Sequence, residues 1–210
     1  MIEVYAFATP NSVKVSIALE ELGLEYALRP VNIRAGAQKD PAFVARNANA
    51  KVPVLVDTSV TGDPLTLSES AAILVYLAEK TGKLLPRSGE GRARVFEQLF
   101  FHASGLGVAF GNAGYFRKLA PEQIPLAIDR FGNEALRILG LLDQTLAKTQ
   151  FVAGAGLTIA DIAHFGWLWR REFAGIDLGN VPNLARWYAA LESRPAFRRG
   201  VARTSALAQA

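Results

Sequence analysis

The amino-acid sequence predicts a small α/β domain followed by an all-helical domain. Within residues 1–82, apolar segments with the alternation of β-strands are interleaved with segments of helical period. From residue 92 to residue 210, every long segment has helical period. Between them lies KLLPRSGEG (83–91), whose proline, glycine and serine residues are typical of a linker. We therefore expect domains at 1–82 and 92–210, joined by a linker at 83–91.

The α/β domain is expected to begin with a strand and a helix. IEVYAFA (2–8) is a short apolar strand. The next segment has apolar residues at helical spacing, and Thr9 and Pro10 suit the N-cap and the first turn of a helix. Gly23 is expected to end this helix, and EYALRPVNI (25–33) to form a second strand.

The remainder of the α/β domain continues this alternation. PAFVARN (41–47) predicts a short helix, whereas VPVLVD (52–57) and LTLS (65–68) predict two strands joined by a turn. SESAAILVYLAEKTG (68–82) has the polar start, apolar middle and final glycine of a helix. The expected order is β-α-β-α-β-β-α, a small mixed sheet with helices on both faces.

The C-terminal domain is expected to consist of helices separated by loops. Segments of helical period cover 92–118, 122–148, 158–172 and 182–193. Thr158 and Asp161 stand at the two positions of a capping box. GLGVAFG (105–111) has the glycines of a phosphate-binding loop, but it lies inside a helical segment rather than after a strand. We interpret it as a kink or a close packing contact.

Missing residue types exclude several classes of chemistry. The chain of 210 residues contains no cysteine, so disulfides, thiolate metal sites and a protein thiol nucleophile are excluded. Its two histidines, His102 and His164, lie among apolar residues. We interpret both as core or interface histidines and expect no metal site.

Charge and hydropathy favour a small anionic ligand over a nucleic acid or a membrane. The formal net charge of +4 is mild, and the concentration of basic residues at 194–203 favours a solvated basic face. No apolar run approaches the roughly 18 residues that a membrane-spanning helix needs. The N-terminal MIEVYAFA has no basic segment, so no signal peptide is expected.

Three stretches of the α/β domain are candidate binding elements. The helix that follows TPN (9–11) presents unpaired N–H groups and the positive end of its dipole. In KVPV (51–54), a cis Val52–Pro53 bond would leave the backbone of Val52 free to pair with an extended ligand. SES (68–70) gives a second helix start with one carboxylate. Alternatively, Thr9 and Asn11 only cap their helix.

The order and spacing of these stretches resemble the glutathione transferase superfamily. LTIADIAHFGW (157–167) also matches the capping motif of that family's helical domain. The Thr-Pro-Asn variant, with ALEELGLEY, LSESAAILVYLAEKTGKLLP and IPLAIDRF, is most similar to the bacterial Nu class, whose members resemble the fungal prion-forming nitrogen regulator. The resemblance implies a thioredoxin-like N-terminal domain, glutathione as cosubstrate, a homodimer and a cytoplasmic location.

Residue by residue, the resemblance first implies a site for the γ-glutamyl and cysteinyl parts of glutathione. Glu69 would pair with the γ-glutamyl amine, while the Ser70 hydroxyl and N–H would receive the carboxylate. Val52, held before cis Pro53, would make two backbone hydrogen bonds to the cysteinyl unit.

Further positions are implied at the edges of the ligand. Gln38 and Lys51 match family positions that reach the glycine end of glutathione. Arg130 matches an arginine that reaches the ligand of the neighbouring subunit in this class. Ala50 departs from the glycine or asparagine common before the Lys-Val-Pro run, which puts the local turn in question.

The sulfur of glutathione would then lie over the helix that begins at Pro10. Lowering a thiol pKa from about 8.5 by about two units requires roughly 2.7 kcal/mol of preferential thiolate stabilisation. A helix N-terminus supplies roughly 0.3–2 kcal/mol, and charge-assisted hydrogen bonds roughly 1.5–3 kcal/mol each. We expect Asn11 to hold the thiolate, with Thr9 as the alternative donor. Tyr5 lies within the strand, so a tyrosine-type mechanism is disfavoured.

The implied function is an enzyme that uses the glutathione thiolate. Reduction of small disulfides is preferred, and conjugation of glutathione to organic electrophiles is the alternative. A third reading is a non-catalytic binding or interaction module. The second substrate is expected between the domains, where aromatic residues are candidate lining residues with an ordinary core role as the alternative: Phe101, Phe110, Tyr115, Phe116 and Trp167.

Overall fold

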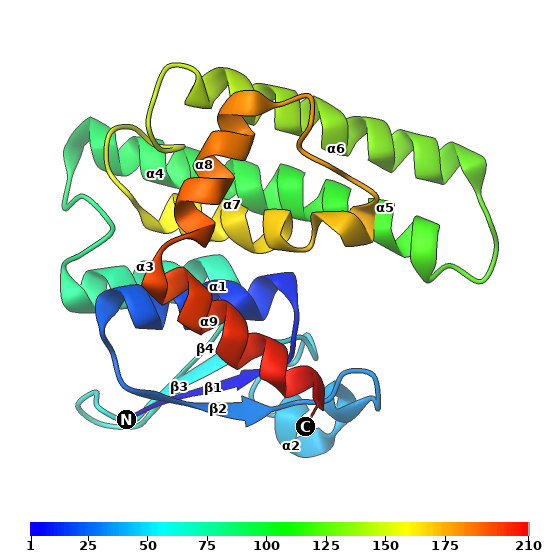
Figure 1. Cartoon of the computed structure of the whole chain (residues 1–210). Coiled ribbons are helices and arrows are strands. Elements are labelled where there is room, and N and C mark those ends of the chain that lie inside the picture. The colour runs from blue at the N-terminus through cyan, green and yellow to red at the C-terminus, as the bar shows by residue number, and fades with distance from the viewer. Residues whose placement is uncertain (210) are drawn as a thin grey trace. The chain divides into compact units, whose positions relative to one another are not determined.

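The chain divides into two compact units in the computed structural model, which describes residues 1–209 (Figure 1). The first unit contains Met1–Lys83 together with the segment from Arg194 onward, and the second contains Leu84–Ser193. The predicted domains differ from these units, because the C-terminal segment groups with the sheet and not with the other helices. Ala210, the last residue of the predicted helical domain, lies outside the described residues.

The sheet of the first unit has the expected mixed topology, with strand order β2-β1-β3-β4. The strands are β1 (Ile2–Ala6), β2 (Tyr26–Pro30), β3 (Val54–Asp57) and β4 (Leu65–Ser68). β1 pairs in parallel with β2 and antiparallel with β3, and β3 pairs antiparallel with β4. Every second side chain of β1 is buried, as a strand with one face on the core requires.

The strand register brings several chain segments to one end of the sheet. Val54, the first residue of β3, lies opposite Tyr5 on β1 and opposite Ser68 on β4. In the parallel pair, Ala6 lies opposite Pro30. The segments that follow β1, β2 and β4 and the segment that precedes β3 are therefore neighbours at this end.

Helices α1 (Pro10–Leu22) and α3 (Ser70–Thr81) lie together over one face of the sheet (Figure 1). α1 ends as predicted at Gly23, whose backbone is left-handed with φ of 68°. The connection from β2 to β3 contains the 3₁₀ turn η1 (Ala37–Lys39) and the short helix α2 (Pro41–Val44).

The helix α9 (Pro195–Ala206) lies along α1 and explains why the C-terminal segment belongs to the first unit (Figure 1). A Cβ atom on Gly200 would lie 2.7 Å from the backbone nitrogen of Ile17, so the two helices approach through a glycine. The Thr204 hydroxyl donates a hydrogen bond to the Ser16 hydroxyl at 2.8 Å. A 3₁₀ turn, η4 (Leu207–Gln209), follows α9.

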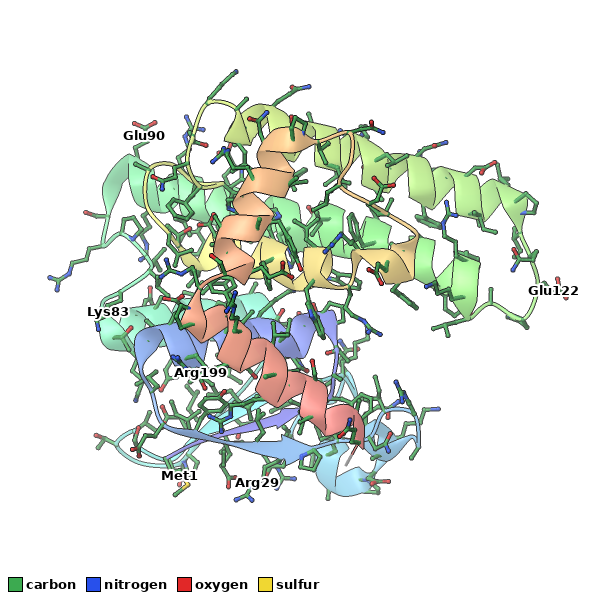
Figure 2. The ribbon with its side chains drawn as sticks, in the orientation of Figure 1. Met1, Arg29, Lys83, Glu90, Glu122 and Arg199 are labelled. Carbon is green, nitrogen blue, oxygen red and sulfur yellow. The ribbon has the colours of Figure 1, made fainter. Side chains whose placement is uncertain are left out.

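Ion pairs with α1 account for several of the basic residues that the sequence concentrates at 194–203. Arg194 donates two hydrogen bonds to Glu21, at 2.7 and 2.9 Å. Arg199, which Figure 2 labels on α9, donates to Glu20 at 2.6 Å, and Arg203 donates to the same carboxylate at 3.2 Å. These arginines therefore tie α9 to the C-terminal half of α1.

The second unit is helical, as predicted. Its elements are α4 (Gly89–Phe101), the π-helical turn η2 (His102–Leu106), α5 (Gly107–Lys118), α6 (Pro125–Leu146), α7 (Ile159–Trp169), the 3₁₀ turn η3 (Arg171–Ala174) and α8 (Pro182–Glu192). α4 begins at Gly89, within the predicted linker at 83–91, and the acidic Glu90 in its first turn favours a helix start there.

The predicted capping box forms at the start of α7. The Thr158 hydroxyl accepts a hydrogen bond from Ala160, and the Asp161 carboxylate accepts one from the Thr158 backbone at 2.9 Å. The same carboxylate also accepts hydrogen bonds from the Val152 backbone and the Trp187 indole. Burial raises the pKa of Asp161. The hydrogen bonds from these donors act in the opposite direction and stabilise the buried carboxylate.

The glycine-rich stretch 105–111 is explained by close packing. The indole of Trp167 lies where Cβ atoms on Gly107 and Gly111 would come within 3.0 and 3.3 Å of it. His102 and His164 are both buried, and their rings meet edge to face at 5.3 Å between centroids, so they are core histidines.

Two kinds of feature are absent from residues 1–209. Within that range, no helix combines the length and the apolar character that crossing a bilayer demands. The same residues include no group of three or more histidine, aspartate or glutamate side chains placed to hold a metal ion.

Candidate functional site

The three predicted stretches meet at one end of the sheet. TPN (9–11) follows β1, KVP (51–53) precedes β3, and Glu69–Ser70 follows β4. The register described above makes these strand ends neighbours. The loop that leads to Gln38 also begins there, because the Val31 N–H donates to the Ala6 carbonyl at 2.8 Å.

Thr9 caps α1. Its backbone is extended, and its hydroxyl oxygen accepts a hydrogen bond from the Ser12 N–H at 3.2 Å. The Thr9 hydroxyl also donates to the Ser12 hydroxyl at 3.0 Å, and that oxygen accepts from the Phe7 N–H at 3.4 Å. The Thr9 hydroxyl therefore acts both as donor and as acceptor within the cap of α1.

Asn11 presents its amide group at the first turn of α1. The side chain is half-buried, and its Oδ1 atom accepts a hydrogen bond from Nζ of Lys14 at 2.7 Å. Because this contact occupies the acceptor end of the amide, its NH₂ group remains as the donor end for a ligand. The first-turn N–H groups of α1 and the positive end of its dipole lie beside it.

Lys14 contacts two residues of the candidate site and was not among the residues predicted from the sequence. Its side chain is 1% exposed, and Nζ also donates to the Ser70 hydroxyl at 3.3 Å. Burial lowers the pKa of Lys14 to about 7, and the nearby Glu69 carboxylate acts in the opposite direction. The signal in the sequence was its spacing, since a residue three positions after Asn11 lies on the same face of a helix.

Glu69 and Ser70 start α3 in an unusual backbone conformation. Glu69 has φ of 66° and ψ of 110°, in a region that a non-glycine residue occupies at a cost of roughly 1–3 kcal/mol. Its side chain is exposed, whereas Ser70 is buried and contacts Lys14. Strained positions of this kind cluster at functional sites, which favours a binding role for Glu69.

The Val52–Pro53 peptide bond is cis, as the sequence analysis considered. Val52 precedes the first residue of β3, and its backbone N–H and C=O have no backbone partner within residues 1–209. Lys51 is exposed, and its carbonyl accepts a hydrogen bond from the Asn47 side chain at 2.7 Å. The N–H and C=O groups of Val52 can therefore pair with an extended ligand at the site, as the edge of a β-strand does.

Ala50 occupies a left-handed turn, a conformation that glycine and asparagine adopt more readily than alanine does. Its φ is 53°, and its N–H donates to the Asn47 carbonyl at 2.8 Å. The turn therefore forms with alanine, at the steric cost that a Cβ atom carries in this conformation.

Gln38 lies in η1, on the connection between β2 and β3. Within the described part of the chain, its buried Oε1 atom has no hydrogen-bond partner. Buried polar atoms are nearly always paired, so an unpaired amide oxygen at this position is consistent with a ligand contact.

Arg130 lies in the second unit. Its side chain is exposed on α6, one turn before Glu134, and its charge helps to lower the pKa of that carboxyl.

The aromatic candidates differ among themselves: Phe110 is fully buried and is a core residue, whereas Tyr115 is 45% exposed. Phe116 stacks on Phe131, with ring centroids 5.6 Å apart.

Known proteins resemble this chain in both of its units. The model of the glutathione S-transferase N-terminal domain matches residues 8–80, and that of the C-terminal domain matches residues 128–195. The disulfide-bond oxidoreductase YfcG of Escherichia coli (strain K12) is 40% identical over 200 residues, which cover 93% of this chain and 92% of that protein.

Two solved structures with bound ligands are similar throughout. A glutathione transferase family member from Pseudomonas fluorescens with two glutathione bound has a TM-score of 0.90 and 39% identity, covering 95% of this chain and 92% of its own. A glutathione transferase from Pseudomonas putida with one glutathione disulfide per subunit has a TM-score of 0.88 and 37% identity, covering 95% and 90%. This chain belongs to the glutathione S-transferase family.

Proposed function

We propose that this protein binds glutathione at the end of its sheet and uses the glutathione thiolate to reduce disulfides. The observation that carries the proposal is the Asn11 amide at the N-terminus of α1, with its oxygen held by Lys14. The chain has no cysteine. Such a site can stabilise a thiolate without supplying one, so the reacting sulfur comes from the ligand. Glutathione is consumed and is therefore a substrate rather than a resident cofactor.

The residues around Asn11 suit the remaining parts of glutathione. Glu69 offers an exposed carboxylate to the γ-glutamyl amine, and Ser70 offers its hydroxyl and a first-turn N–H to the carboxylate. The open backbone groups of Val52 would pair with the cysteinyl unit as a strand edge does. Gln38 and Lys51 would hold the glycine end.

The thiolate is stabilised by two kinds of interaction. At neutral pH a free thiol with a pKa of about 8.5 is only a few per cent ionised. The N-terminus of α1 contributes roughly 0.3–2 kcal/mol, and a charge-assisted hydrogen bond from Asn11 roughly 1.5–3 kcal/mol. Their sum reaches the roughly 2.7 kcal/mol that a two-unit fall in pKa requires. The engaged Thr9 hydroxyl makes Asn11 the principal donor.

The reaction proceeds by two thiol–disulfide exchanges. A first glutathione thiolate attacks one sulfur of the substrate disulfide, forming a mixed disulfide and releasing one substrate thiolate, which takes up a proton. A second glutathione thiolate attacks the glutathione sulfur of the mixed disulfide. This step releases the other substrate thiol and forms glutathione disulfide, so two glutathione molecules supply the two electrons.

The relatives support reduction over conjugation. The similar Escherichia coli protein is named a disulfide-bond oxidoreductase, and the Pseudomonas fluorescens structure holds two glutathione molecules. The Pseudomonas putida structure holds the oxidised product of such a reaction, one glutathione disulfide per subunit. Conjugation to organic electrophiles would use the same thiolate and is the competing activity to measure.

The assembly is proposed to be a homodimer. Phe100 on α4 is 69% exposed, and Val108 on α5 is 49% exposed, as expected of side chains that a second copy covers. In that dimer, the exposed Arg130 would reach the glutathione of the neighbouring subunit. We place the protein in the cytoplasm, where glutathione is kept reduced and can serve as reductant.

The proposal is tested by two assays on the same preparation. One measures glutathione-dependent reduction of a small model disulfide, and the other measures conjugation of glutathione to an aromatic halide. We expect faster turnover in the first assay, and thermal stabilisation by both reduced and oxidised glutathione at millimolar concentration. Faster conjugation would contradict reduction. Stabilisation without turnover would indicate a binding module, and no stabilisation would refute the glutathione site.

A further inference from the structure

We infer that Lys14 is a positioning residue of the site, which fixes the Asn11 amide with its NH₂ group toward the glutathione sulfur and supplies a buried positive charge behind it. This inference rests on the proposed function, because it assigns a role in holding the thiolate. Lys14 itself does not touch the sulfur: it acts through Asn11.

The geometry of the contact selects one orientation of the amide. Nζ of Lys14 lies 2.7 Å from Oδ1 of Asn11. An ammonium group has three donors and no acceptor, so it can pair with the oxygen of the amide but not with its NH₂ group. An asparagine turned the other way would direct its oxygen at the thiolate and repel it. Lys14 therefore prevents the unfavourable orientation.

The position of Lys14 joins the two helix starts that form the site. The residue is one turn after Asn11 on α1, and Nζ also donates to the Ser70 hydroxyl at the start of α3, at 3.3 Å. Its side chain is 1% exposed and Ser70 is buried, so the ammonium group lies in a water-poor environment. A fixed donor in such an environment is worth more than the same donor in water.

The charge of Lys14 responds to the ligand. Burial lowers the pKa of Lys14 to about 7, and the Glu69 carboxylate at the start of α3 acts to raise it. On the α9 side, the charged groups Arg199 and Arg203 are bound to Glu20, in the C-terminal half of α1. A thiolate on the far side of the Asn11 amide is an additional anion, so its binding favours the ammonium form of Lys14.

A pH titration of bound glutathione tests this role. Ultraviolet absorbance of the thiolate gives the pKa of the bound thiol in wild-type protein and in Lys14→Met, which keeps an unbranched side chain and removes the charged terminal group. We expect the variant to raise this pKa by about one unit, an approximately tenfold fall in thiolate fraction below the pKa. Lys148→Met, which removes an exposed lysine from the other unit, serves as control and should not move it.

Binding of S-methylglutathione, which has no ionisable thiol, separates positioning from binding. We expect Lys14→Met to retain its affinity for this ligand within about threefold. A more than tenfold loss would show that Lys14 supports the γ-glutamyl site instead, contrary to the inference. If Lys14→Met does not fold by circular dichroism, Lys14→Gln provides a second uncharged side chain for both measurements.

The outcomes distinguish this inference from the proposed function. A wild-type protein that binds neither glutathione nor S-methylglutathione would overturn the proposed function, and the role of Lys14 with it. The role of Lys14 alone would be overturned by a different result. In that case the wild-type protein binds glutathione and lowers its thiol pKa, and the Lys14→Met variant lowers that pKa equally.

Discussion

The side chain of Asn11 has a donor end and an acceptor end, and only the donor end can stabilise a thiolate. In this protein the acceptor end is bound to Lys14, and the neighbouring Thr9 hydroxyl is engaged in the cap of α1. The two residues of the Thr-Pro-Asn stretch therefore have different tasks. Thr9 keeps the helix start in place, and we propose that Asn11 contacts the ligand.

Replacing Asn11 by alanine should impair turnover more than binding. Loss of one charge-assisted hydrogen bond of about 1.5–3 kcal/mol predicts a fall in kcat of about 10- to 100-fold. The Kd for glutathione should change by less than about threefold. Steady-state kinetics and calorimetry check both values, with Thr9→Ser, which keeps the capping hydroxyl, as control. A raised Kd with unchanged kcat would reverse the assignment.

Two left-handed residues allow strain to be separated from binding. Ala50 and Glu69 have φ values of 53° and 66°, where glycine has no Cβ penalty. We expect Ala50→Gly and Glu69→Gly each to raise the free energy of unfolding by about 1 kcal/mol in denaturant titrations. Only Glu69→Gly should weaken glutathione binding. Equal affinity in the two variants would refute the role of the Glu69 carboxylate.

The low pKa of Lys14 has a consequence for the stability of the ligand-free protein. Its pKa is about 7 in the folded state against 10.5 in the unfolded chain, so between these values the unfolded state binds more protons. Stability from this group therefore rises with pH from about 7 upward. Between pH 7 and pH 9, the wild-type free energy of unfolding should rise by about 2 kcal/mol relative to that of Lys14→Met. A constant difference across this range would mean that Lys14 titrates as an exposed lysine does.

At the scale of elements, α1 is the helix on which the site depends, and α9 supports it. The contact passes through Gly200, the Ser16–Thr204 hydrogen bond and three arginines bound to the C-terminal half of α1. The C-terminal helix α9 therefore supports α1, although it lies far from the proposed site residues in the sequence.

A methyl group on Gly200 should separate these helices. In Gly200→Ala, the new Cβ atom would lie 2.7 Å from the backbone nitrogen of Ile17, and a backbone atom cannot turn away as a side chain does. We expect a loss of about 1–3 kcal/mol in the free energy of unfolding. Gly140→Ala on α6, where no atom lies within 4 Å, should be neutral or stabilising by up to about 1 kcal/mol. Similar values for both substitutions in chemical denaturation would contradict the close contact.

At the scale of the whole molecule, the sequence predicts the mixed sheet, the helical unit and the convergence of TPN, KVP and SES. Their strand and helix periods are regular, and their turn residues are specific. α9 was not predicted as a separate helix, because its arginines resemble a solvated basic face until Glu20 and Glu21 are placed beside them. Lys14 was missed for a similar reason, since a helix lysine is normally exposed.

The backbone of Glu69 illustrates what sequence patterns do not contain. The residue type does not predict a φ of 66°, because glutamate rarely adopts this value. The surrounding strand and helix impose the conformation. The cis Val52–Pro53 bond was considered from the sequence, since only a bond before proline is commonly cis.

The products of a single turnover experiment test the central claim most directly. Because the chain has no cysteine, both electrons must come from glutathione. With a small model disulfide, we predict one glutathione disulfide formed for each substrate disulfide consumed, and no glutathione covalently attached to the protein by mass spectrometry. Consumption of the substrate without glutathione disulfide, or release of a stable glutathione conjugate in its place, would contradict the account.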